Sequence, residues 1–349
     1  MCIYLGSAPE LTYNKREHIF PAGMGGVNTL PQGWVSDRAN ALFSPLEGKL
    51  MHLSPVSLDR SLFGPGDRRG RPSKSNVTVG VEDDGKIVLS YLSLGKPYLI
   101  DQVYMRSGDA EVSANDDGSS GGDILERMRA ALGRFSAGDR FVFLPSPDIP
   151  DGEILIGALN GKIYVACCGE RPDGETVYAA IQKFLGGFAQ GELKRDSRHV
   201  RQRHVLAENG EIARVYAKTA MNALARLRGP EYVLRPAFDG IRRWVVSGEN
   251  GEEFNYLPSI SAARLTPAPA LPEDAHYCLF LQVEGELRAL VSFYGRYTRQ
   301  FTLGAPAGSA DFSFPEGYVC DWKNKDEFTL QEHMERLVGR RRDKIENIC

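Results

Sequence analysis

The spacing of apolar positions first indicates a helix after Ser36. Residues three and four positions apart are apolar there: Ala39, Leu42, Phe43, Leu46 and Leu50. Ser36 is a suitable N-cap, so we expect a helix from Ser36 that Pro45 kinks or ends and that resumes to about Leu53. The same spacing predicts further helices at 124–132, 175–185, 211–228, 238–246 and 325–342.

Alternating apolar positions predict strands elsewhere in the chain. Hairpins are expected around Asp83-Asp84-Gly85, Asn160-Gly161 and Glu284-Gly285-Glu286, and a further strand near 140–144. We expect a loop or an internal boundary at residues 107–123, which are rich in Gly, Ser and Asp. We expect a linker at residues 258–272, which are rich in Pro and Ala. This mixture of elements predicts the α+β class.

Residues 16–28 contain the chemistry that stands out. Ile19 and Phe20 favour an extended backbone, Pro21 pushes Phe20 toward the β region, and three glycines at 23, 25 and 26 require a tight loop. Glu17 and His18 are therefore expected at the end of a strand, just before a turn. Asn28 follows the loop, and Asn40 lies in the first turn of the helix expected after Ser36.

This order of strand, glycine loop, strand and helix, with His18, Asn28 and Asn40, resembles the HNH nuclease family, the ββα-metal fingers. The most specific likeness is Glu17-His18-Ile19-Phe20-Pro21 followed by Gly25-Gly26, and residues 2–7 are similar to the opening of many members. Asn40 stands where many members carry the final histidine, which suggests an HNN variant. The likeness extends to about residue 75.

The resemblance implies a metal-dependent endonuclease that hydrolyses phosphodiester bonds, with DNA as the expected substrate. His18 would be the general base and Asn28 would orient it. Glu17 and Asn40 would bind one Mg²⁺ or Mn²⁺, a hard ion that prefers oxygen ligands. Taken singly, each of these residues also suits an ordinary structural role at a strand end, a turn or a helix start.

The zinc site that many members carry is not expected here. Leu5 replaces the second cysteine, residues 35–39 contain none, and Cys2 alone cannot form a tetrahedral site. The finger must then be held by apolar packing of six side chains: Ile3, Tyr4, Ile19, Trp34, Phe43 and Leu46.

Two basic segments are candidates for phosphate contacts. Residues 59–75 hold five cations against two aspartates, and residues 194–204 hold five against one. The candidate contacts are Arg60, Arg68, Arg69, Lys194, Arg195, Arg198, Arg201 and Arg203, with Arg60 or Arg68 as a clamp on the scissile phosphate. A solvated linker and a surface strand are the alternative interpretations.

Composition narrows the class of protein. The 349 residues are 42% hydrophobic and 25% charged, without an apolar run near the roughly 20 residues of a membrane helix. A secretion signal is not expected at the start, and six irregularly spaced cysteines favour a reducing cytoplasm. The net charge of −3 means that nucleic-acid contacts would come from local patches.

We expect three segments: the finger with its basic loop at 1–75, an α+β domain at 76–193, and a helical pair with a C-terminal β-hairpin region at 194–349. The last would contact nucleic acid or regulate the nuclease, and a role in host defence would suit an enzyme that must be kept silent in its own cell. The alternative is a catalytically inactive nucleic-acid-binding or ligand-sensing protein with a degenerate finger. A homodimer, a regulatory ligand and a regulatory protein partner remain open.

Overall fold

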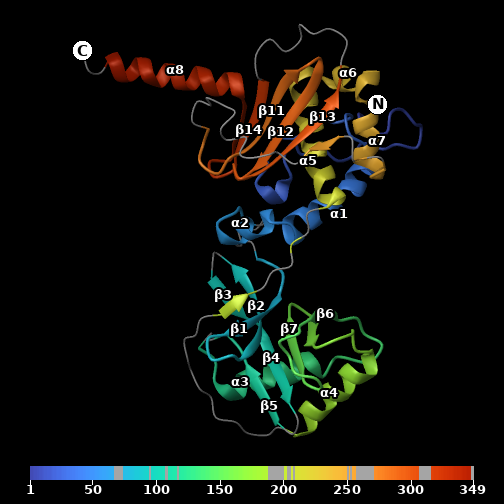
Figure 1. The fold of residues 1–349 in the computed structure, drawn as a ribbon, viewed down its shortest axis with the longest axis vertical. Coiled ribbons are helices and arrows are strands. Elements are labelled where there is room, and N and C mark those ends of the chain that lie inside the picture. The colour runs from blue at the N-terminus through green and yellow to red at the C-terminus, as the bar shows by residue number, and fades with distance from the viewer. Residues whose placement is uncertain are drawn as a thin grey trace. The chain divides into compact units, whose positions relative to one another are not determined.

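The computed structural model describes residues 1–66, 74–93, 96–106, 109–115, 118–187, 200–202, 206, 209–249, 251, 254–256, 271–305 and 316–346. The chain has the predicted α+β class and divides into two compact units (Figure 1). Unit 1 comprises Met1–Ser73 and Leu206–Cys349, and unit 2 comprises Lys74–Val205. Unit 2 is therefore an insertion within the sequence of unit 1.

Unit 1 begins with a short hairpin around the glycine loop. One β-bridge joins His18 to Thr29, and the flanking backbone hydrogen bonds run from Ile19 N to Asn28 O (3.0 Å) and from Leu30 N to Glu17 O (2.8 Å). The loop between them contains the 3₁₀ helix η1 (Ala22–Met24). Because the pairing is an isolated bridge rather than a regular ladder, the ββα finger stays an expectation.

Helices α1 (Asp37–Leu53) and α2 (Val56–Leu62) follow the hairpin. The Ser36 side chain accepts a hydrogen bond from Ala39 N, which confirms the predicted N-cap. The prediction that the helix could end at Pro45 is wrong, since α1 continues through it. Pro45 is exposed, and the burial of Phe43, Leu46 and Leu50 on the other side offsets one lost backbone hydrogen bond.

The rest of unit 1 combines helices with an antiparallel sheet (Figure 1). The helices are α5 (Gly210–Arg228), α6 (Pro230–Val233), η2 (Pro236–Phe238), α7 (Asp239–Ser247) and α8 (Leu330–Glu346). The sheet order is β10 (Asn255–Tyr256), β13 (Tyr297–Gly304), β12 (Glu286–Phe293), β11 (His276–Val283), β14 (Glu316–Asp321) and β15 (Asp326–Thr329). The helix expected at 325–342 therefore begins only at Leu330, because Asp326–Thr329 forms strand β15 and pairs with β14.

One hydrophobic core joins the finger, α5, α7 and the sheet. Ile3, Tyr4, Ile19, Phe43 and Leu46 all belong to it, and Trp34 packs against it, which confirms that these six side chains share a core. Helix α5 is buried along most of its length, and its alanines allow neighbouring elements to approach closely. The expected segments 1–75 and 194–349 therefore share one compact unit.

The described residues of unit 2 form two sheets and two helices, α3 (Gly121–Leu132) and α4 (Gly174–Gly187). The first sheet runs β3 (Lys96–Leu99), β2 (Ile87–Ser93), β1 (Thr78–Glu82) and β9 (Val200–Gln202). The second runs β5 (Asp109–Ser113), β4 (Asp101–Arg106), β7 (Ile154–Leu159), β8 (Lys162–Cys167) and β6 (Val142–Pro145). The loop predicted at 107–123 is therefore wrong in part. Strand β5 forms within it because Ala110 and Val112 alternate toward a core.

None of the described helices in either unit combines the length and the apolar character needed to cross a bilayer.

Candidate functional site

Glu17 lies in a buried polar cluster rather than at an open surface. Glu17 is 7% exposed. Its Oε1 accepts hydrogen bonds from Lys218 Nζ and, at 3.4 Å, from Asn222 Nδ2. Lys218 and Asn222 are one turn apart on α5. The carboxylate that the resemblance assigns to a metal therefore already contacts a cation of the protein itself.

Lys218 joins two carboxylates from separate parts of the finger. Its Nζ forms ion pairs with Glu17 on the hairpin and with Glu47 on α1, and its side chain is 1% exposed. The Phe43 ring centroid lies 5.7 Å from the same nitrogen. Burial alone would lower the pKa of Lys218, but the charges of Glu17 and Glu47 outweigh it and raise that pKa, so the ammonium stays protonated.

Tyr4 and Asn222 complete the cluster, which we call the Lys218 cluster: Tyr4, Glu17, Glu47, Lys218 and Asn222. The Tyr4 hydroxyl lies 2.6 Å from Asn222 Oδ1 and 3.1 Å from the Lys218 backbone oxygen, and it donates to them. Asn222 Nδ2 also donates to the His18 backbone oxygen at 2.9 Å. Burial, followed by the charge of Glu17, raises the pKa of Tyr4, which keeps the donor protonated. These bonds fix the backbone and the carboxylate of the Glu17-His18 pair.

His18 is only half-buried, in contrast to Glu17. Successive side chains of an extended segment point to opposite sides, which agrees with a buried Glu17 beside a half-buried His18. The structure therefore separates the two residues that the motif sets side by side: the carboxylate belongs to the core and the imidazole lies nearer to solvent.

Asn28 is held by the C-terminal sheet. Its Nδ2 donates to the Tyr318 hydroxyl at 2.9 Å and to the Glu327 backbone oxygen at 3.4 Å. Glu327 Oε1 in turn accepts from Val27 N (2.7 Å) and Asn28 N (3.2 Å). Burial raises the pKa of Glu327, while these backbone donors oppose that rise. Asn28 thus anchors the glycine loop to β14 and β15.

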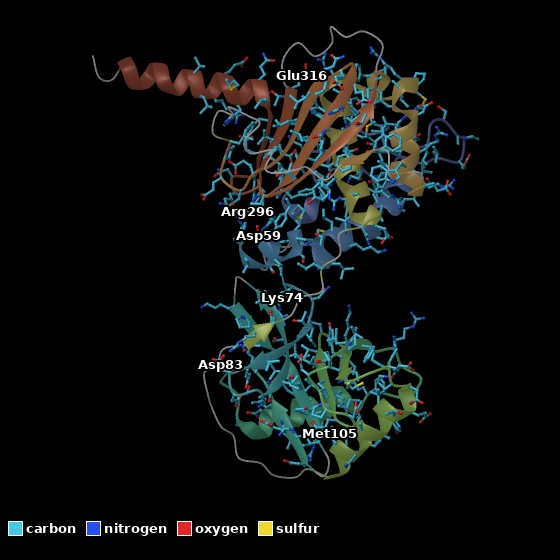
Figure 2. All side chains as sticks on the ribbon, viewed as in Figure 1. Asp59, Lys74, Asp83, Met105, Arg296 and Glu316 are labelled. Atoms are coloured by element: carbon cyan, nitrogen blue, oxygen red, sulfur yellow. The ribbon has the colours of Figure 1, made fainter. Side chains whose placement is uncertain are left out.

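His276 on β11 holds the other side of the loop. Its Nε2 lies 2.8 Å from Met24 O and its Nδ1 accepts from Tyr294 N at 2.9 Å, so the neutral ring carries its proton on Nε2. Burial lowers its pKa to about 4. Nearby, Arg296 Nη1 donates to Asp59 Oδ2 at 2.8 Å and fastens α2 to the β12–β13 turn (Figure 2).

Asn40 lies on the same side of α1 as Glu47, two turns earlier. Its Nδ2 is buried and has no hydrogen-bond partner in the part of the chain that the structure describes. The residues do not fit Mg²⁺ as arranged, because the Lys218 ammonium already contacts the Glu17 carboxylate that would bind the ion. Within the described ranges, three or more His, Cys, Asp or Glu side chains are nowhere grouped as metal ligands would be.

The predicted phosphate contacts lie partly outside the described residues: Arg68, Arg69, Lys194, Arg195, Arg198 and Arg203 do. Arg60 is 9% exposed, and its Nε donates to Gly23 O at 2.8 Å. Burial lowers its pKa. Arg201 is exposed on β9, 3.8 Å from Asp83. Of the two described candidates, only Arg201 presents its charge to solvent.

Sequence reasoning missed Lys218 and a second group of cations. Lys218 and Asn222 are four residues apart in the middle of α5, among alanines and other small or apolar residues, and this i, i+4 polar pair was the available signal. Lys15 and Arg16 directly precede Glu17, and Arg38 follows Asp37; all three side chains are exposed. Lys15 and Arg16 lie close to His18 in the sequence, and Arg38 lies at the start of α1, so their positions could have identified them as candidate phosphate contacts.

Comparisons of the chain with protein-family models, with curated proteins and with solved structures found no match.

Proposed function

We propose that this chain binds the phosphate backbone of nucleic acid through its HNH-like finger and that this binding needs no divalent cation. The observation that supports this proposal is the division of charge in the finger. Glu17 is paired inside the core with Lys218, while Lys15 and Arg16, which precede Glu17 in the sequence, and Arg38, in the first turn of α1, are exposed. A surface of this sign attracts phosphates, and the Lys218 ammonium offsets part of the negative charge of Glu17 and Glu47.

Asp37 ties the segment that carries Lys15 to the start of α1, where Arg38 follows. Its carboxylate accepts hydrogen bonds from Asn14 N (3.0 Å), Lys15 N (2.9 Å) and the Thr12 hydroxyl (2.7 Å). These bonds lower the pKa of Asp37 to about 2 and hold residues 12–15 beside Arg38. Lys15, Arg16 and Arg38 form no ion pair with the described part of the chain, so their charges are available to a ligand. We call these three residues the finger cations.

Charge reversal of the finger cations tests the proposal. The triple variant Lys15→Glu, Arg16→Glu and Arg38→Glu should bind fluorescently labelled DNA and RNA more weakly than the wild type. Fluorescence anisotropy across a salt series should show the slope of log K against log[salt] reduced by about 2–3 for duplex DNA, since each lost phosphate contact removes about 0.9.

The matched control reverses three exposed lysines of unit 2, Lys96, Lys162 and Lys183, with the same change in net charge. That control should retain the wild-type salt slope. Equal losses in both triple variants would show a general charge effect and contradict a specific surface on the finger. A wild-type protein that binds neither DNA nor RNA at low salt would also contradict the proposal.

The second candidate function is metal-dependent cleavage by His18, Asn28, Glu17 and Asn40, which would require Glu17 to leave Lys218 for the ion. The observation that favours it is that His18 is only half-buried. A plasmid-nicking assay with Mg²⁺ or Mn²⁺ separates the two functions. Nicking by the wild type that the His18→Ala variant loses would establish cleavage. Binding that persists in excess EDTA, without His18-dependent nicking in Mg²⁺ or Mn²⁺, would support the metal-free function.

A further inference from the structure

We propose that the Lys218 ammonium takes the place of a divalent cation between Glu17 and Glu47, and that removing this ammonium converts the Lys218 cluster into a divalent-cation site. The inference goes beyond nucleic-acid binding and does not depend on it. It starts from the disagreement described above: a finger of this kind would bring a metal to Glu17, and the structure brings a lysine there instead.

The geometry of the cluster allows such an exchange. Glu17 Oε1 and Glu47 Oε1 both contact the same nitrogen atom, so the two oxygens are close enough for one small cation to touch both. They come from different elements, the hairpin and α1, and the common core holds each element in place. Two preplaced carboxylate oxygens are a suitable start for a site for Mn²⁺ or Mg²⁺.

The electrostatics favour a replacement cation. Without the ammonium, two negative charges would remain in a largely buried place, where the amide of Asn222 is the one other side-chain donor to Glu17 among the described residues. Buried like charges are costly unless a cation compensates them. The Glu47 side chain is 21% exposed, which gives an ion and its water ligands a route from solvent.

Lys218→Met is the substitution that leaves the required space. Methionine keeps an unbranched side chain through three atoms beyond Cβ and lacks the terminal nitrogen that contacts the carboxylates. The Lys218→Arg variant keeps the positive charge and serves as the conservative control. Lys49→Met serves as the exposed control, because Lys49 pairs with Glu211 at 2.5 Å and both side chains are 41% exposed.

The experiment titrates each full-length protein with Mn²⁺ and follows free Mn²⁺ by electron paramagnetic resonance. Lys218→Met should bind one more Mn²⁺ per chain than the wild type, whereas Lys218→Arg and Lys49→Met should match the wild type. Adding Glu17→Gln to Lys218→Met should abolish the additional site. The inference is overturned if Lys218→Met binds no more Mn²⁺ than the wild type, or if the Glu17→Gln double variant keeps the additional ion.

A refolding measurement covers the case in which Lys218→Met does not fold alone. Its yield of folded protein after dilution from urea is compared with and without Mn²⁺. Recovery that requires Mn²⁺ and that is absent from the Glu17→Gln double variant supports the inference. A yield that Mn²⁺ does not raise overturns it.

Discussion

At the scale of single residues, Lys218 determines the surroundings of Glu17. A lysine that is 1% exposed is stable only with negative charge around it, and Glu17 and Glu47 supply that charge. The same contacts remove Glu17 from the chemistry that its place beside His18 suggests. A motif read along the chain could not show this, because Lys218 lies about 200 residues away from the hairpin.

Removal of the ammonium in the absence of added metal should destabilise the protein strongly. We expect Lys218→Met to lower the free energy of unfolding by about 3–5 kcal/mol, because two carboxylates lose their buried partner. Urea unfolding measures this change. Lys49→Met, at an exposed pair, should change the same free energy by less than about 0.5 kcal/mol. Similar effects of the two substitutions would contradict a special role for Lys218.

His276 gives unit 1 a defined response to acid. Its pKa is about 6.5 when unfolded and about 4 in the folded protein, where burial disfavours its charged form. The unfolded state therefore binds more protons between these values, and stability falls as the pH is lowered through this window. From pH 7 to about pH 5, this residue should remove about 2 kcal/mol from the free energy of unfolding.

The His276→Gln variant isolates that effect, since its amide can donate to Met24 O and accept from Tyr294 N without titrating. Urea unfolding at pH 7 and at about pH 5 should show the wild type losing about 2 kcal/mol more than this variant. Equal losses in the two proteins would mean that His276 does not carry the acid response.

At the scale of elements, the glycine loop has no space for a side chain at Gly26. A Cβ on Gly26 would lie 2.1 Å from Phe20 O, whereas a Cβ on Gly48, within α1, would meet nothing within 4 Å. The two glycines are therefore opposite cases. Gly26 permits the close approach of backbone atoms in the hairpin loop. Gly48 has no such role, and its flexibility only increases the conformational entropy that α1 loses on folding.

Alanine at these two positions should change stability in opposite directions. We expect Gly26→Ala to lower the free energy of unfolding by about 1–3 kcal/mol through overpacking against backbone. Gly48→Ala should raise it by about 0.5–1 kcal/mol through the better helix propensity of alanine. Thermal and urea unfolding of the two variants measure both changes. Tolerance of alanine at Gly26 would refute the described loop packing.

The elements that sequence reasoning found are those with undisturbed periodicity. Helices α1, α3, α4, α5 and α7 and the turns at Asn160-Gly161 and Glu284-Gly285 match the expectations. Strand β13 was missed because Arg299 occupies a buried position and hides the alternation. Strand β3 was missed because it is a four-residue edge strand that contains Pro97. Local patterns cannot reveal a polar residue that becomes buried through distant partners.

At the scale of the whole molecule, the chain is two units with separate cores. Two hydrophobic clusters lie entirely within unit 2, whereas the finger shares its core with α5 and the sheet of unit 1. The boundary near residue 75 was visible in the sequence as a change from basic loop to strands. The sequence did not show that residues 1–73 and 206–349 form one unit, because this depends on contacts between residues more than 200 positions apart.

This organisation predicts different outcomes for two fragments. Residues 74–205 should fold alone and unfold cooperatively, because their cores lie within the fragment. Residues 1–73 should remain unfolded alone, because Tyr4 and Phe43 need α5 to complete their core. Circular dichroism and the dispersion of amide signals by nuclear magnetic resonance measure both. A folded 1–73 fragment would contradict the shared core.

The central claim is that Lys218, rather than a divalent ion, neutralises Glu17 in the wild-type protein. A crystal structure of the wild type soaked in Mn²⁺, with anomalous diffraction data, tests it most directly. We predict electron density for Lys218 Nζ in contact with Glu17 and Glu47 and no anomalous peak between Glu17 and Asn40. An anomalous peak bound by Glu17 and Asn40, with Lys218 turned away, would contradict the account.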